Sequence, residues 1–188
     1  RWEATVEGIA VGTPQVGGQG QMVYITHNTW SETFQGYMRG RLSVFRNDFN
    51  GMGGEVPMNG AGAMGFADKD APFGPVSVVT KSDGTDHVYW GEAWDEGRAS
   101  YGLLYEFDSA TFHLTGLAPT SWSTIMAPTL SADGSSMWLG GQGSCIHGWP
   151  RGHSFADRPA WSVTVDPGAG VTPISTPLAV SADEARVC

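Results

Sequence analysis

The chain has 188 residues, of which 40% are hydrophobic, and its 19 acidic and 10 basic residues give a formal net charge of −9 at pH 7. This size and hydrophobic fraction suffice for one globular domain or part of a larger one, and the acidic excess excludes a general phosphate-binding surface, so nucleic acid is not an expected partner. No apolar run reaches the roughly 18 residues that span a bilayer, and 27 glycines and 11 prolines favour many short strands joined by turns.

A short unit recurs four times along the chain, and its copies begin at Pro14, Pro75, Pro128 and Pro177. After each proline the sequence runs through an apolar stretch, a turn, and a second apolar stretch that contains aromatic residues in most copies. Asp-Gly and Gly-rich turns tolerate the positive φ angles that tight hairpins need. Each copy therefore predicts a β-hairpin, with turns at residues 17–20, 82–85, 131–134 and 181–184.

A third strand with a common ending is expected after each of the first three hairpins. The segments 42–47, 103–108 and 161–166 align without a gap, and each closes on an Asn or Asp that can turn the chain by bonding its own backbone. A short fourth strand is expected near residues 55–58, 115–117 and 169–173. The main strands are predicted near residues 22–27, 42–46, 76–80, 87–91, 103–107, 128–131, 136–140 and 161–165.

The same order of strands and turns recurs about every 50 to 60 residues, and such recurrence is typical of a repeat architecture. It predicts an all-β fold, a β-propeller of four-stranded antiparallel blades, whereas a β-sandwich gives no reason for the same order to return three times. Because a propeller closes a ring to protect its sheet edges, residues 1–188 are expected to form a single partial propeller within a larger one. The expected blades are residues 9–60, 73–120 and 124–172, flanked by the last strand of a preceding blade at 1–8 and the first strands of a further blade at 173–188.

The segments Ala127–Gly141 and Gly102–Thr111 resemble the repeat of the PQQ-like, or quinoprotein-like, β-propeller superfamily. In that superfamily a blade reads as a proline-led strand, a turn, an apolar–aromatic strand, and a Gly-led strand that ends in Asp-x-x-Thr-Gly. Here Phe112 stands where the motif has Gly, and no Thr-Gly follows Asn47 or Asp166. The resemblance therefore implies degenerate repeats of a partial propeller, for which no quinone or other cofactor is expected.

Cys145, His147 and His153 are the candidate metal ligands of the chain. Cys145 and His147 alternate onto one face of a strand, which would bring both near a zinc or copper ion. The spacing matches no standard structural zinc pattern, so a packing or surface role is favoured and no metal is expected. Cys145 and Cys188 could form one disulfide, but buried free thiols are favoured because both fall in predicted strands. No catalytic residue is assigned.

Aromatic side chains are the remaining signal for function. The tryptophans that fall in predicted loops, where a ring can anchor a partner protein, are Trp30, Trp94, Trp122 and Trp149. Long loops expected at residues 28–39, 51–70 and 142–158 could vary freely on a rigid scaffold.

The leading functional hypothesis is a non-enzymatic β-propeller that serves as a scaffold or protein-interaction subunit of a larger assembly. Two alternatives stay open: part of a quinone- or metal-dependent oxidoreductase propeller, and an extracellular carbohydrate-binding propeller whose Trp side chains stack on sugar rings. The acidic, lysine-poor composition favours a secreted, periplasmic or organelle-lumen setting, such as the thylakoid lumen, although no targeting signal assigns a compartment.

Overall fold

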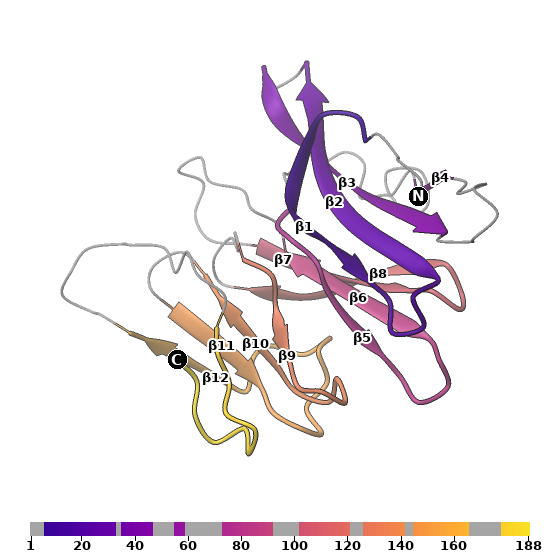
Figure 1. The fold of residues 1–188 in the computed structure, drawn as a ribbon. Helices are drawn as coiled ribbons and strands as arrows, with labels where there is room; N and C mark the ends of the chain where they lie inside the picture. Colours follow the sequence, from indigo (N-terminus) through magenta and orange to yellow (C-terminus); the bar gives the residue numbers. More distant parts are fainter. Residues whose placement is uncertain are drawn as a thin grey trace.

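The computed structural model describes residues 6–32, 35–46, 55–58, 73–91, 102–120, 126–141, 145–165 and 178–188. This part of the chain consists of strands, turns and irregular backbone, and it contains no helix. Within these described ranges, twelve strands form three four-stranded antiparallel sheets (Figure 1), in each of which neighbouring strands are also consecutive in the chain. The all-β prediction and the four-stranded antiparallel sheets are therefore confirmed.

The first sheet contains β1 (Ile9–Val16), β2 (Met22–Ser31), β3 (Gly36–Arg46) and β4 (Glu55–Met58). The second sheet contains β5 (Ser77–Thr80), β6 (Asp86–Gly91), β7 (Gly102–Asp108) and β8 (His113–Thr120). The third sheet contains β9 (Thr129–Leu130), β10 (Met137–Gly140), β11 (Cys145–Trp149) and β12 (Trp161–Thr164).

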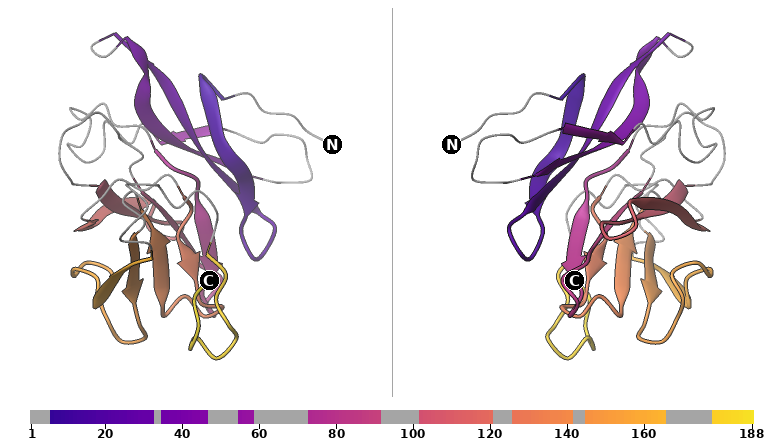
Figure 2. Two further views of the ribbon diagram at one scale, coloured as in Figure 1. Left: turned by 90° about the vertical axis from the view of Figure 1, so that its left-hand side faces the viewer. Right: turned by 90° about the vertical axis from the view of Figure 1, so that its right-hand side faces the viewer.

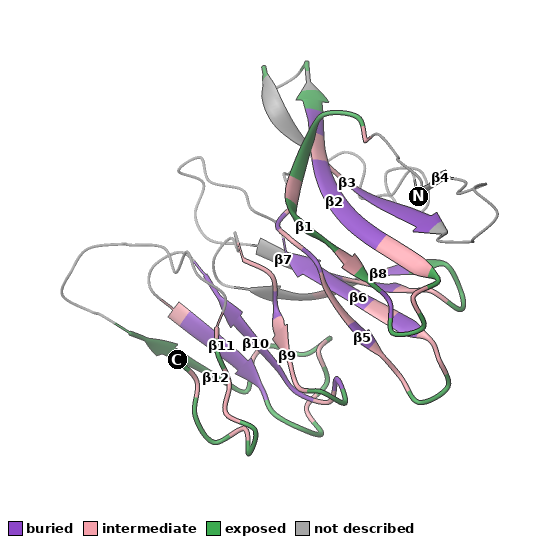
Figure 3. Cartoon of the chain, viewed as in Figure 1, coloured by how far each residue is buried: buried purple, intermediate pink, exposed green. Residues whose placement is uncertain are grey.

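The three sheets are layered like the blades of a propeller (Figure 2), and their first strands lie side by side, β1 against β5 and β5 against β9. Apolar clusters fill the spaces between sheets. The cluster between the first and second sheets contains Tyr24, Leu42, Val44, Val76, Val88, Trp90, Tyr105, Phe107 and Leu114. The cluster between the second and third sheets contains Leu104, Met137, Leu139 and Trp149. Buried residues concentrate in the middle strands (Figure 3), where each large apolar side chain contributes about 1.5–3 kcal/mol.

One turn geometry joins the first two strands of every repeat. In each copy the amide of the fourth turn residue donates to the carbonyl of the first, and that fourth residue has a positive φ in the left-handed region. Glycine occupies this position in three copies, and Glu184 occupies it in the fourth with φ 58°. The four hydrogen bonds are Gly20 to Gly17, Gly84 to Lys81, Gly134 to Ser131 and Glu184 to Ser181. The predicted hairpins are thus present, including a fourth within residues 178–188, where Val180 bridges Val187.

The third sheet corrects the strand alignment made from the sequence. Its third strand is β11, and the segment 161–166, expected as the third strand, supplies β12, the fourth. The Asp-ended pattern misassigned the order because β11 has no such ending and contains Gly148, over which the indole of Trp161 lies. The predicted loop 142–158 therefore includes a buried strand, and the fourth strand expected at 169–173 lies outside the described residues.

Two further expectations concern the first sheet and the residues before it. The segment 28–39, expected as a loop, is largely strand, because β2 extends to Ser31 and β3 begins at Gly36. Of the strand expected at residues 1–8, only residues 6–8 are described, and they are not part of a strand.

A buried carboxylate joins the first hairpin to the second sheet. Asp86 is 5% exposed. Its Oδ1 accepts from Thr80 Oγ1 (2.6 Å) and from the Gly18 amide (3.3 Å), and its Oδ2 accepts from the Tyr24 hydroxyl (2.8 Å). Burial, and then the hydrogen bond to Asp86, raises the pKa of Tyr24 well above its usual range, so the phenol stays a donor. Three donors from two sheets offset the desolvation of one buried charge.

We expect Asp86→Ala to lower the free energy of unfolding by about 2–4 kcal/mol, because it leaves buried hydroxyl donors without their acceptor. Asp83→Ala is the matched control, since Asp83 lies exposed on the turn of the same hairpin and accepts from the Thr85 amide. Urea denaturation of the two variants checks this. Equal, small losses for both would show that the Asp86 junction does not hold the sheets together.

Candidate interaction surface

The second and third strands of the first sheet extend past their neighbours as a two-stranded arm, which in the described part of the chain comprises residues 29–32 and 35–39. The last β1–β2 pair is Ile9 with Asn28, whereas β2 and β3 continue to pair through Thr29 with Arg39 and Ser31 with Gly36. The arm stands out from the body of the molecule in Figures 1 and 2. A protruding hairpin presents side chains beyond the sheet that carries it.

The base of the arm is fixed by side chains of β2. Thr26 Oγ1 donates to the Gly74 carbonyl (2.7 Å), and the Asn28 side-chain oxygen accepts from the Phe73 amide (2.8 Å). On the opposite side, His27 Nδ1 donates to the Glu7 carbonyl (2.6 Å) and Nε2 bonds Ser43 Oγ (2.9 Å). Thr26 and His27 are 0% and 3% exposed. These buried contacts on both sides hold the arm in one orientation relative to the sheets.

Trp30 lies on this arm, and it is 47% exposed. The sequence placed Trp30 in a loop, but the structure places it in β2, two residues beyond the anchor at Asn28. The same stretch of sequence carries further large apolar residues at positions 34, 37 and 38, namely Phe, Tyr and Met. A large exposed indole on an anchored hairpin is suited to contact with another molecule, because little conformational entropy is lost on binding.

The other tryptophans singled out from the sequence do not join Trp30. Trp149 is in β11 rather than a loop and is 0% exposed, with its Nε1 donating to the Asp157 carbonyl (2.9 Å), so it is a core residue of the third sheet. Its place after Gly and before Pro suggested a loop, and only the packing of two sheets buries it. Trp94 and Trp122 lie outside the described residues.

The three candidate metal ligands each have a separate hydrogen-bond partner. Cys145 Sγ lies 3.5 Å from Thr164 Oγ1, His147 Nδ1 lies 2.7 Å from Ser162 Oγ, and His153 Nε2 donates to the Arg158 carbonyl (2.8 Å). Within the described ranges, no three His, Cys, Asp or Glu side chains are grouped so that they could hold a metal ion.

No disulfide joins the two cysteines. Cys145 is partly buried and Cys188 is exposed, so the expected burial of both thiols is not seen at Cys188. Among the described residues, no helix has the length and apolar character needed to cross a membrane.

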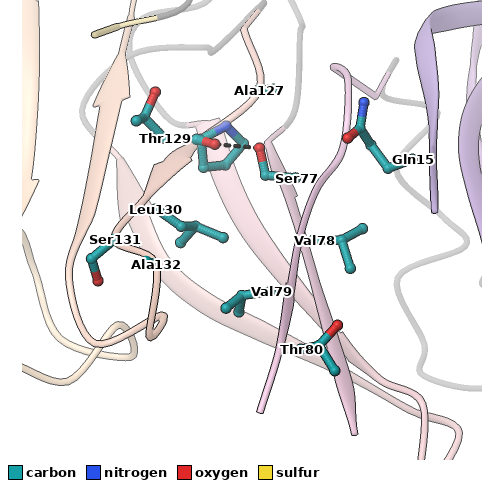
Figure 4. A pocket seen from close by; sticks show the side chains of 11 residues that line it. Gln15, Ser77, Val78, Val79, Thr80, Ala127, Thr129, Leu130, Ser131 and Ala132 are labelled. Atoms are coloured by element: carbon teal, nitrogen blue, oxygen red, sulfur yellow. Dashed lines mark hydrogen bonds between the residues drawn. The ribbon is translucent and has the colours of Figure 1, made fainter. Parts of the chain in front are cut away.

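A groove of about 560 Å³ runs between the first strands of the second and third sheets. Figure 4 shows its wall, in which hydroxyl side chains such as Ser77 lie beside apolar ones such as Val79 and Leu130. Thr80 donates to Asp86, Ser77 donates to the Pro128 carbonyl, and Thr129 donates to the Leu178 carbonyl (3.0 Å). Thr80 Oγ1 also accepts from the Gly18 amide (2.7 Å) in the first hairpin. Each of these hydroxyls therefore has a contact outside its own sheet, and their role in the structure is to link neighbouring blades.

Comparisons with known proteins bear on the fold alone. No protein-family model matches the chain, and no curated protein matches it. Nineteen chains of solved structures match. One of them, described as "Structure of Dos1 propeller", is 16% identical over 81% of this chain and 34% of that chain, with a TM-score of 0.49. The chain thus spans about a third of that structure. The three layered sheets themselves assign the β-propeller fold.

A pH dependence follows from His147, which is 1% exposed, and whose Nε2 has no hydrogen-bond partner among the described residues. Burial lowers the pKa of this imidazole below its ordinary 6.5. The unfolded chain therefore binds a proton at His147 before the folded chain does, and stability is lost as pH falls below 6.5.

We expect the free energy of unfolding to decrease between pH 6.5 and pH 5, and His147→Gln to lessen that decrease. Denaturant titrations at several pH values check the slopes. An unaltered slope in His147→Gln would contradict the buried, neutral state of this side chain.

Proposed function

We propose that this chain is a non-enzymatic β-propeller scaffold that holds another protein through the arm, as a subunit of a larger assembly. The observation that carries the proposal is the 47% exposure of Trp30 on a hairpin whose base is anchored by buried hydrogen bonds. Tryptophan is enriched among the residues that dominate protein interfaces, and an anchored strand presents it without a large loss of entropy.

Acidic side chains on the turns between strands stabilise those turns, which is a structural role and agrees with a scaffold. Asp108 Oδ1 accepts from the amides of Ala110 (2.8 Å) and Thr111 (3.0 Å), and Asp133 Oδ1 accepts from the Ser135 amide (3.0 Å). Hydrogen bonds from Ser135 and Ser131 hold the pKa of Asp133 far below its usual range. Such carboxylates stabilise turns and stay ionised, which contributes to the net charge of −9. An acidic surface favours a partner with a neutral or basic face.

We further propose that the repeats are a degenerate form of the PQQ-like propeller repeat. Support comes from the turn that recurs in four copies and from β7, a Gly-led strand that ends at Asp108 and continues into a turn. Retention of the blade pattern with loss of its Thr-Gly ending is consistent with a propeller kept for its shape. A secreted or lumenal setting remains part of this proposal.

The proposal predicts a protein contact at Trp30. A photo-reactive phenylalanine analogue at position 30, in the protein expressed in its native host, should give a reproducible covalent adduct with one protein. With that protein purified, Trp30→Ala should weaken binding about 30-fold or more, because truncation of a central interface Trp costs about 2 kcal/mol or more.

Phe112→Asn is the matched control, because Phe112 is 41% exposed on the β7–β8 turn, at a positive φ that Asn tolerates. Binding by this variant should equal that of the unaltered protein. Unchanged binding by Trp30→Ala would contradict the proposal. So would a glycan array on which the protein binds a sugar and loses that binding with Trp30→Ala, since the carbohydrate-binding alternative would then hold.

A further inference from the structure

The outer strand of the third sheet, β12, has a regular edge that no other described strand covers. In the described part of the chain it pairs with β11 alone, at the end of its sheet. The pairing runs without a register shift from Trp161, opposite Gly148, to Thr164, opposite Cys145. We call the outer side of residues 161–164 the β12 edge.

The backbone groups that point out of the β12 edge belong to Ser162 and Thr164. Successive residues of an antiparallel strand direct their amide and carbonyl groups to opposite sides. The Gly148 carbonyl accepts from the Ala160 amide, so the backbone groups of Gly148 point toward β12. Trp161, which pairs with Gly148, therefore bonds inward, as does every second residue after it. The residues between them, Ser162 and Thr164, direct their amides and carbonyls outward.

The outer strands of the other two sheets contain residues that oppose further pairing, and β12 does not. Glu55 and Pro57 lie in β4, and Pro119 lies in β8. Proline has no amide to donate, and natural sheets place proline and charge on edge strands to prevent pairing with another chain. The sequence of β12, Trp-Ser-Val-Thr, contains neither. Of the three outer strands, β12 is therefore the one suited to accept a further strand.

Exposed apolar side chains alternate with hydroxyl side chains along this strand. The exposed fractions are 38% for Trp161, 53% for Val163 and 59% for Val165, whereas β10 and β11 are largely buried (Figure 3). Ser162 and Thr164 lie on the other face, where their hydroxyls contact side chains of β11. An exposed apolar row thus lies beside backbone groups that point outward.

The five residues from Trp161 to Val165 are self-complementary in an antiparallel pair. With a two-fold axis at Val163, this residue lies opposite Val163 of the second copy, and Trp161 lies opposite Val165. Ser162 lies opposite Thr164, and these are the residues whose backbone groups point outward. Apolar side chains then face apolar ones and hydroxyls face hydroxyls, with no like charges opposed. A two-fold interface requires this match of a surface with itself.

From this pattern we propose that the β12 edge binds a second copy of this protein, with the two β12 strands paired antiparallel around Val163. The palindromic order of apolar and hydroxyl residues favours a second copy over an unrelated strand. The contact is short, so the dimer dissociates on dilution, with a Kd in roughly the micromolar range. The inference does not rest on the proposed contact at Trp30, because β12 and the arm belong to different sheets.

Sedimentation equilibrium on the full-length protein, from about 1 μM to about 500 μM, tests this. The mass should rise from that of a monomer to that of a dimer. Val163→Lys should weaken the dimer at least about tenfold, because it places two like charges directly opposite each other across the two-fold axis. Ala156→Lys is the matched control, since it adds the same charge at an exposed position on the loop after β11 and should leave the Kd unchanged.

A charge-swap experiment tests the register. Val163→Glu alone should also weaken the dimer, whereas an equimolar mixture of Val163→Lys and Val163→Glu should associate at least about tenfold more tightly than either variant alone. Hydrogen exchange in the unaltered protein needs no variant. The amides of Ser162 and Thr164 should exchange at least about tenfold more slowly at the highest concentration than at the lowest, and those of Trp161 and Val163, which bond inward, should change little.

A mass that stays monomeric over the whole range would overturn the proposal. So would a dimer that Val163→Lys leaves unchanged, since the copies would then meet elsewhere. A mixture of the two charge variants that does not associate would contradict pairing around Val163. Protection of Ser162 and Thr164 that appears only when a different protein is added would assign the β12 edge to that protein and overturn the assignment to a second copy.

Discussion

The alignment of the sheets depends on hydrogen bonds between the first hairpin of one blade and the next blade. Asp86 is the clearest case, because its buried carboxylate accepts hydrogen bonds from Tyr24 in the first sheet and from Thr80 in the second. The apolar clusters between sheets supply more free energy, but they are not directional and would tolerate a shifted alignment. The buried carboxylate does not tolerate such a shift, because a shift of one sheet against the other would leave it desolvated without its hydrogen-bond donors.

The same constraint separates the scaffold from the parts that can contact other molecules. Serine and threonine hydroxyls along the first strands are engaged with neighbouring carbonyls and carboxylates, so the groove between β5 and β9 links the sheets. The arm and the exposed apolar side chains of β12, Trp161 and Val163, lie away from these strands, on the long β2–β3 hairpin and on the outer strand of the third sheet. Function on repeat scaffolds usually resides in such peripheral elements, because the stacked core leaves little freedom for variation.

The sequence predicted the hairpins correctly because their turn chemistry is local. The fourth residue of each turn needs a positive φ, which glycine adopts most easily, and glycines at positions 20, 84 and 134 therefore indicate the turns in the sequence. The order of β11 and β12 could not be predicted in the same way. Gly148 weakens the strand signal of β11, yet it is the residue that makes room for the Trp161 indole from the neighbouring strand. The surroundings of the candidate tryptophans could not be predicted for the same reason. Trp149 is buried by the packing of two sheets, and Trp30 lies on a strand extension whose base is held by the bond between Asn28 and the distant Phe73.

Hydrogen exchange in Thr80→Val tests most directly whether hairpin contacts couple the sheets. This nearly isosteric change removes the nearer of the two acceptors of the Gly18 amide and one donor to Asp86. The account predicts faster exchange in residues 22–25 of the first sheet as well as in residues 86–90 of the second, because the two share the junction. Faster exchange confined to the second sheet would show that the sheets are stacked by apolar packing alone and would contradict the account.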